Sequence, residues 1–99
     1  MSGSVYIAGP MTGIAEFNYP MFNTVAAELR RNGRTVHNPA ENGGGSSDQP
    51  WAFYMRLAIK QLVECEEVCL LPGWENSRGA RIEEGLARDL GMTVWEWRA

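Results

Sequence analysis

Two adjacent carboxylates follow a buried apolar run in residues 70–87, which read LLPGWENSRGARIEEGLA. The pattern predicts a strand, a turn of small polar residues, and then a helix that carries Glu83 in its second turn. Turns of this kind are where open α/β folds bind ligands. Because Gly79 and Ala87 lie four residues before and after Glu83, an acid at this position has space beside it. The segment therefore predicts a reactive carboxylate next to a small substrate.

Helical spacing distinguishes Glu83 from Glu84. A buried stripe with a four-residue period is expected, formed by Ile82, Leu86 and Leu90. Glu84 has Arg81 three residues before it and Arg88 four residues after it, which is typical of a solvated ion-pair face. Glu83 borders the buried face and has no cation on its own stripe. The start of the helix should favour its ionised form, as a nucleophile requires.

Other polar and aromatic residues near this turn allow two roles each. Ser77 is a typical helix N-cap, and with the backbone N–H groups of residues 78–80 it can also hold an anion such as phosphate. His37 follows at the carboxyl end of a strand and either contacts ligand or is an ordinary loop residue. Trp74 either stacks on a base or packs between subunits. Glu75 is either a second acid or a solvent-facing loop residue.

The elements that must position these residues alternate along the chain. Apolar runs ending at Gly or Pro predict strands, and 3.6-residue periodicity predicts helices between them. The order βαβαβαβ predicts an α/β, flavodoxin-like (Rossmann-like) fold with a parallel four- to five-stranded sheet and helices on both faces. Loops 9–13 and 72–79 should then meet at the switch point of the sheet. The expected strands are 5–8, 35–37, 68–71 and 93–97, the expected helices begin at Pro20, Pro50 and Gly79, and 40–49 is expected to be a flexible loop.

Composition limits the classes of partner. A chain of 99 residues predicts one domain, residues 1–99, and four Trp in so short a chain favour a homodimer or higher homo-oligomer. The net charge of −3 argues against a nucleic-acid polymer as partner. Cys65 and Cys69 are four residues apart and there is a single His, so we expect no metal site. No basic start or long apolar run is present, so we expect no membrane partner and a cytoplasmic location.

Two motifs together point to a family. YIAGPMTG at residues 6–13 and S-x-G-x-x-x-E-x-G-x-A at residues 77–87 resemble the nucleoside 2-deoxyribosyltransferase superfamily. With Phe17-Asn18, Asn38-Pro39 and LLPGWENSRGA, the chain is similar to the small DUF4406 branch found in bacteriophages and bacteria. The resemblance implies a Glu nucleophile at Glu83 that attacks the anomeric carbon of a nucleoside or nucleotide. A glycosyl ester then passes its sugar to water or to a second base, in a retaining double displacement without a cofactor.

The resemblance also implies which residues contact which part of the substrate. In the transferases the position of Ser77 is typically Asp, whereas relatives that hydrolyse deoxynucleoside 5′-monophosphates carry Ser, so Ser77 favours a nucleotide. Loop 9–13 should lie against the sugar and base, with Tyr6 and Met11 as walls. We take Glu83 as the catalytic residue. The residues expected to bind substrate are Tyr6, Gly9, Pro10, Met11, Gly13, His37, Trp74, Glu75, Ser77, Gly79 and Ala80.

One departure from the family pattern leaves alternatives open. Relatives usually carry an Asp in the second helix, and Ala58 occupies that position here. That Asp assists catalysis, and loss of general acid assistance typically costs about a hundredfold or more in rate. The leading hypothesis is therefore an N-glycosidase or deoxyribosyltransferase-like enzyme. The alternatives are a nucleotide-binding protein that sequesters its ligand without turnover, and a structural protein that assembles through its Trp residues.

Overall fold

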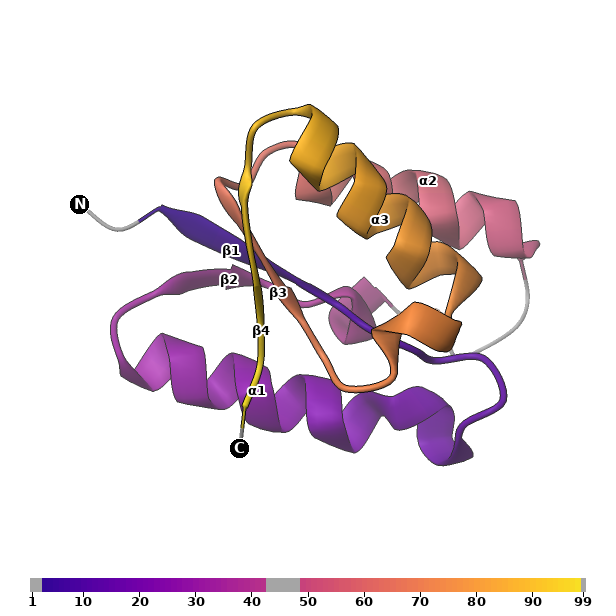
Figure 1. Ribbon diagram of the computed structural model, residues 1–99. Helices are drawn as coiled ribbons and strands as arrows, with labels where there is room; N and C mark the ends of the chain where they lie inside the picture. Colours follow the sequence, from indigo (N-terminus) through magenta and orange to yellow (C-terminus); the bar gives the residue numbers. More distant parts are fainter. Residues whose placement is uncertain (1–2, 43–48, 99) are drawn as a thin grey trace.

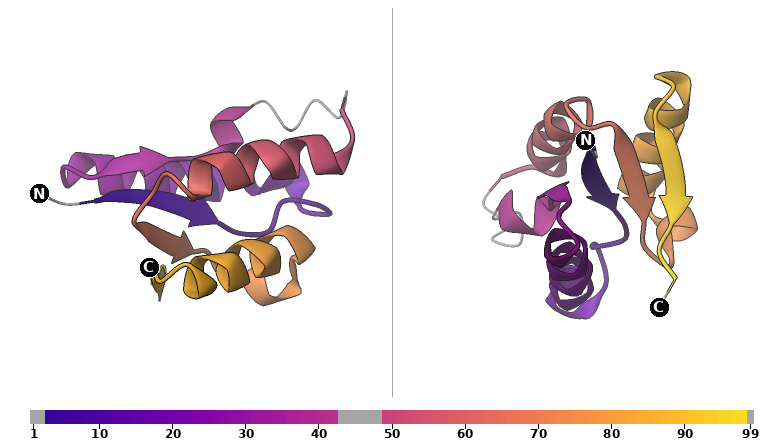
Figure 2. Two further views of the ribbon diagram at one scale, coloured as in Figure 1. Left: turned by 90° about the horizontal axis from the view of Figure 1, so that it is seen from above. Right: turned by 90° about the vertical axis from the view of Figure 1, so that its left-hand side faces the viewer.

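The computed structural model describes residues 3–42 and 49–98. These residues form four strands, β1 (Ser4–Ala8), β2 (Thr35–His37), β3 (Glu67–Leu70) and β4 (Thr93–Glu96). The strands pair in parallel in the order β2-β1-β3-β4, and the arrows of β1, β3 and β4 point the same way in Figure 2, right. The predicted flavodoxin-like α/β fold is confirmed in this part of the chain.

Three longer helices connect the strands: α1 (Tyr19–Arg31), α2 (Trp51–Leu62) and α3 (Arg78–Asp89). Helix α1 lies below the sheet in Figure 1, whereas α2 and α3 lie above it. Right-handed crossovers require this division, since the chain moves from β1 to β2 in one direction and from β2 to β3 and β4 in the other. The two faces of the sheet therefore carry separate cores.

Alternation along the central strand β1 distributes its side chains between these cores. Val5 and Ile7 pack with the apolar stripe of α1, whose buried residues are Phe22, Val25, Ala26 and Leu29. Tyr6 and Ala8 face α2 and α3 and pack with the second cluster, which includes Ala58, Leu62, Val68, Leu70 and Ala87. A tyrosine hydroxyl is thereby buried in the middle of an otherwise apolar layer.

The predicted buried stripe of α3 is wrong at Ile82 and Leu90, whereas Leu86 is partly buried against the second cluster. Ile82 is 44% exposed and Leu90 is 55% exposed, and the buried residues of the helix are Ala80, Glu83 and Ala87. Because alanine side chains are small, a helix that turns these residues inward can lie close to the strands. Glu83 consequently sits within the buried stripe rather than at its border.

The segment expected to be a flexible loop, 40–49, is partly ordered. Residues 39–42 form the 3-10 turn η2 (Pro39–Asn42), in which Glu41 pairs with Arg30 at 2.8 Å. The Asn42 and Gln61 side-chain amides exchange two hydrogen bonds of 3.0 and 2.9 Å. The prediction was thus wrong for residues 40–42, while residues 43–48 lie outside the described part of the chain. In the described ranges, no helix has the length and apolar character needed to cross a bilayer.

Candidate active site

The loops that follow β1 and β3 meet at the switch point of the sheet, as predicted. Leu71 N donates to Ala8 O at 2.8 Å. A Cβ added to Gly9 would lie 2.8 Å from Leu71 Cβ, so the first loop tolerates no larger residue there without a shift. Gly73 adopts φ +89° and faces the Pro10 ring, where an added Cβ would lie 3.3 Å from Cγ. These contacts bring the two glycine-containing loops to one place.

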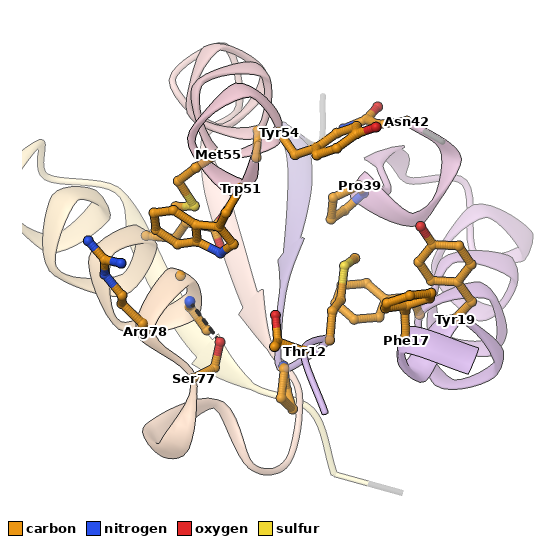
Figure 3. Close-up of a pocket in the computed structure, with 18 of the residues that line it drawn as sticks. Thr12, Phe17, Tyr19, Pro39, Asn42, Trp51, Tyr54, Met55, Ser77 and Arg78 are labelled. Carbon is orange, nitrogen blue, oxygen red and sulfur yellow. Dashed lines mark hydrogen bonds between the residues drawn. The ribbon is translucent and has the colours of Figure 1, made fainter. Parts of the chain in front are cut away.

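A cavity of about 700 Å³ opens beside this junction, within the size range of small-molecule sites. Figure 3 shows its two sides: Trp51, Met55, Ser77 and Arg78 lie on one, and Phe17, Tyr19 and Pro39 lie opposite. The first side comes from α2 and the start of α3, and the second from the start of α1 and η2. The cavity is thus bounded by segments distant in sequence.

Glu83 lines this cavity although its side chain is almost withdrawn from solvent, with 5% exposed. Tyr6 Oη donates a hydrogen bond to Glu83 Oε2 at 2.6 Å. Burial raises the pKa of Glu83 to about 7, and the hydrogen bond from Tyr6 acts in the opposite direction. Desolvation therefore opposes the ionised form of Glu83, which the start of the helix was expected to favour.

Tyr6 is the partner of the acid rather than an exposed wall. It is 0% exposed, and burial followed by the nearby Glu83 charge raises its pKa well above the usual value. The phenol therefore keeps its proton and acts as the donor in the pair. The sequence-based expectation placed Tyr6 at the cavity correctly but missed this bond.

At the mouth, Ser77 and Arg78 begin α3. Ser77 Oγ accepts from Ala80 N at 3.2 Å, which confirms the N-cap. The Arg78 guanidinium carbon lies 4.4 Å from the centre of the Trp51 ring, a cation–π contact that joins α3 to α2. Among the described residues that line the cavity, Arg78 and Glu83 are the only charged ones. The site thus combines one buried acid with one cation at its edge.

Most of the predicted site residues come together at this cavity. Those that line it are Tyr6, Gly9, Pro10, Met11, Ser77, Gly79, Ala80 and Glu83. Gly79 marks a close approach between helices, since an added Cβ would lie 3.3 Å from Met55 Sδ on α2. Ala58 also lines the cavity, although it is only 7% exposed. Ala58 therefore faces the same space as Glu83.

Four predicted contact residues do not line the cavity: Gly13, His37, Trp74 and Glu75. Trp74 is half-buried against the cluster that contains Tyr6 and Ala58. His37 lies half-buried on β2, paired in register with Tyr6, and Gly13 and Glu75 are exposed. The structure does not bring these four residues to the cavity, and their contact with substrate stays a prediction.

Sequence reasoning missed the aromatic lining of the cavity, namely Phe17, Tyr19, Trp51 and Tyr54. Trp51, the first residue of α2, is 41% exposed at the mouth of the cavity. Phe17 appeared only as part of a motif. The available signal was position, because these residues open α1 and α2 at the carboxyl edge of a parallel sheet, where ligands bind.

Thiols and metal ligands contribute nothing to the cavity. Cys65 and Cys69 are free and buried, and desolvation followed by the Glu67 charge raises the pKa of Cys69 to about 12. In residues 3–42 and 49–98, no three His, Cys, Asp or Glu side chains gather as a metal site would require. The chemistry available here is that of a carboxylate and its phenol partner.

Comparison with known families identifies the chain. The sequence model of the DUF4406 family, described as a domain of unknown function, matches residues 3–96, so the chain belongs to this family. No curated protein matches the sequence.

Proposed function

We propose that this DUF4406 protein cleaves the N-glycosidic bond of a small (deoxy)nucleoside 5′-monophosphate through a covalent glycosyl ester on Glu83. The proposal treats the family as a branch of the nucleoside 2-deoxyribosyltransferase superfamily. The observation that carries it is the buried Glu83 carboxyl, held by Tyr6 inside a cavity of about 700 Å³. A nearly inaccessible acid that forms none of the ion pairs among the described residues is costly for stability, which favours a chemical role.

The first step is attack by a Glu83 oxygen on the anomeric carbon. The new C–O bond forms as the C–N bond breaks, its electron pair leaves with the base, and the base takes up a proton from solvent. The Tyr6 bond fixes one carboxylate oxygen, Oε2, so that the other can point at the sugar. Gly79 and Ala80, neither of which carries a bulky side chain, line the same cavity as Glu83.

The second step regenerates the acid. Water attacks the anomeric carbon of the ester, the carboxylate leaves, and one proton is released, giving the free sugar phosphate with retained configuration. If a second base replaces water, the same intermediate gives transfer instead of hydrolysis. The residues that line the cavity are compatible with both acceptors.

Ser77 and Arg78 support a phosphorylated substrate. The start of α3 presents backbone N–H groups, and its cap residue carries no charge that would repel an anion. Arg78 adds a positive charge at the same edge, held against Trp51. A carboxylate in place of Ser77 would instead favour an uncharged nucleoside.

The direct test is incubation with deoxynucleoside 5′-monophosphates and with the matching nucleosides, followed by chromatography for free base. We expect base release from the monophosphates and a sugar phosphate adduct on Glu83 by peptide mass spectrometry. Glu83→Gln is the matched control and should abolish both. Absence of free base and of adduct in the wild-type protein would overturn the proposed reaction.

Ala58 favours a second candidate function, that of a protein which binds a nucleotide without turnover. The cavity holds no other carboxylate among its described lining residues to assist the departing base. Under this alternative, nucleotides raise the melting temperature of the wild-type protein while no base is released over hours. An Ala58→Asp variant that gains base release would then identify the missing acid as the cause.

The exposed apolar side chains of α2 and α3 favour assembly into a homodimer or higher homo-oligomer. Phe53, Val63, Ile82 and Leu90 are each more than 40% exposed. Analytical ultracentrifugation of the wild-type protein and of an Ile82→Glu variant tests this point. Since nucleoside monophosphates are metabolites of the cytoplasm, the proposed substrate also implies the cytoplasm of a bacterium or a phage-infected host.

A further inference from the structure

Three consecutive non-glycine residues adopt left-handed backbone angles beside the cavity. Glu16 and Phe17 have φ 54° and ψ 27°, and Asn18 has φ 61° and ψ 16°. All three belong to η1 (Ala15–Asn18). Left-handed angles are unfavourable for residues with a Cβ and normally occur singly, mostly at Gly or Asn. Such strain is retained where the surrounding structure fixes it, often at a functional site.

Hydrogen bonds to the first loop fix this turn. Asn18 Nδ2 donates to Pro10 O at 3.0 Å, and Phe17 N donates to Ile14 O at 2.9 Å. Ile14 N in turn donates to Met11 O at 3.2 Å. Since Pro10 and Met11 also line the cavity, the strained turn is tied to the cavity wall itself.

The turn and the first residue of α1 that follows it each present an aromatic ring to the cavity. Phe17 is 38% exposed and lines it, and the adjacent Tyr19 ring lies at a centroid distance of 5.9 Å and a tilt of 44°. The Tyr19 hydroxyl is buried and has no hydrogen-bond partner among residues 3–42 and 49–98. A buried hydroxyl without a partner is costly, and a polar group of a ligand would satisfy it.

We propose that the strained turn Glu16–Asn18, together with Tyr19 at the start of α1, forms the wall that recognises the base: Phe17 stacks on a planar heterocycle and Tyr19 Oη hydrogen-bonds to its polar edge. This inference rests on the proposed function and assigns the base to one side of the cavity. Phe17 and Tyr19 lie opposite Ser77 and Arg78 in Figure 3, and β1, the strand of Tyr6, passes between the two sides. A monophosphate bound with its phosphate at Ser77 would thus direct its base toward Phe17.

The test measures binding in a Glu83→Gln background, which prevents cleavage, by calorimetry with the four deoxynucleoside 5′-monophosphates and with 2-deoxyribose 5-phosphate. Stacking on an aromatic ring contributes enough that Phe17→Ala should weaken nucleotide binding about tenfold or more. Binding of 2-deoxyribose 5-phosphate, which has no base, should change less than about twofold. Phe17→Leu, of similar bulk without a ring face, should resemble Phe17→Ala.

Tyr19→Phe removes only the hydroxyl. We expect it to weaken binding of at least one of the four nucleotides by about threefold or more while 2-deoxyribose 5-phosphate is unaffected. This pattern would show that the Tyr19 hydroxyl hydrogen-bonds to the polar edge of the base. A uniform change across all five ligands would overturn that role.

The outcomes separate this inference from the proposed reaction. Equal losses for nucleotides and sugar phosphate in Phe17→Ala, or full affinity in Phe17→Leu, would overturn the stacking role even if the wild-type protein releases base. If the variants lose affinity for the nucleotides but not for 2-deoxyribose 5-phosphate, and the wild-type protein releases no base, the role of Phe17 and Tyr19 in base binding is supported and the proposed reaction is overturned. Failure of the Glu83→Gln and wild-type proteins to bind any of the nucleotides would overturn both.

Discussion

Tyr6 Oη lies 2.6 Å from Glu83 Oε2, and this hydrogen bond joins the central strand to α3 inside an apolar layer. The two residues are 77 positions apart in sequence. The bond orients the carboxyl and partly offsets the effect of burial on its pKa. The pair therefore sets both the geometry and the protonation state of the candidate nucleophile.

Tyr6→Phe should shift the pH dependence of base release toward higher pH. Because the phenol bond lowers the pKa of Glu83, its loss raises that pKa above about 7 and leaves less ionised acid at neutral pH. A hydrogen bond to a charged group contributes about 1.5–3 kcal/mol, which corresponds to a shift of about one to two pH units. Rates measured from pH 5 to 9 check this. An unshifted profile would show that the bond does not control ionisation.

Glu83→Gln should remove a pH dependence of stability. A carboxyl whose pKa is about 7 when folded, against a usual value of 4.5, binds its proton more tightly in the folded state. Wild-type stability should therefore fall as pH rises from about 4.5 to 7, by roughly 3 kcal/mol, and then level off. Gln can still accept from Tyr6 but cannot ionise.

The measurement is urea unfolding of wild-type and Glu83→Gln proteins at pH 4.5, 6 and 8. Subtracting the two curves cancels the other titrating groups, including the Arg30–Glu41 pair. The free energy of unfolding of Glu83→Gln minus that of the wild-type protein should increase as pH rises. A difference that stays constant with pH would contradict a raised pKa.

Ser77→Asp should separate the two roles of Ser77. Aspartate is an equally good N-cap, so the free energy of unfolding should change by less than about 0.5 kcal/mol, whereas Ser77→Ala should lose about 1 kcal/mol. The added charge should repel a phosphate, so the ratio of monophosphate to nucleoside affinity should fall about tenfold or more. Equal affinity ratios in wild-type and Ser77→Asp proteins would place the phosphate elsewhere.

Ala58→Asp should accelerate base release. Ala58 lines the same cavity as Glu83, so a carboxyl there can give its proton to the departing base. General acid assistance contributes about a hundredfold or more in favourable cases. Ala58→Asn is the matched control, since it has the same size and cannot serve as the acid. Single-turnover rates compare the two, and equal rates would contradict a role in proton transfer.

Much of the fold follows from local signals in the sequence. Apolar runs that end at Gly or Pro locate the strands, and the stripe of α1 is visible because its apolar residues face a purely apolar sheet surface. The buried stripe of α3 was predicted wrongly because its sheet-facing residues are not the large apolar ones. There the sheet-facing residues are small or acidic, and the larger apolar residues Ile82 and Leu90 are exposed.

The sequence predicts those residues of the candidate site that lie together in one segment. It does not predict the contacts that form between segments distant in sequence. Glu83 and Ser77 share one turn and helix, so spacing identifies them. The Tyr6 bond, the Arg78–Trp51 contact and the Phe17–Tyr19 pair depend on tertiary packing. Left-handed angles at Glu16 and Phe17 carry no sequence signal at all, because neither residue favours them.

Glu16→Gly should stabilise the protein, which would show that the left-handed turn stores strain. A residue with a Cβ loses roughly 1–2 kcal/mol in this conformation, and glycine avoids that cost but loses more backbone entropy on folding. The net gain in the free energy of unfolding should be about 0.5–1 kcal/mol. Glu16→Ala keeps the Cβ and should stay within about 0.5 kcal/mol of wild type, because Glu16 is exposed. Equilibrium urea unfolding at pH 7 separates the two variants. Equal stability would mean that the turn is unstrained, whereas stabilisation by glycine alone would show that the chain keeps a costly backbone conformation beside the cavity.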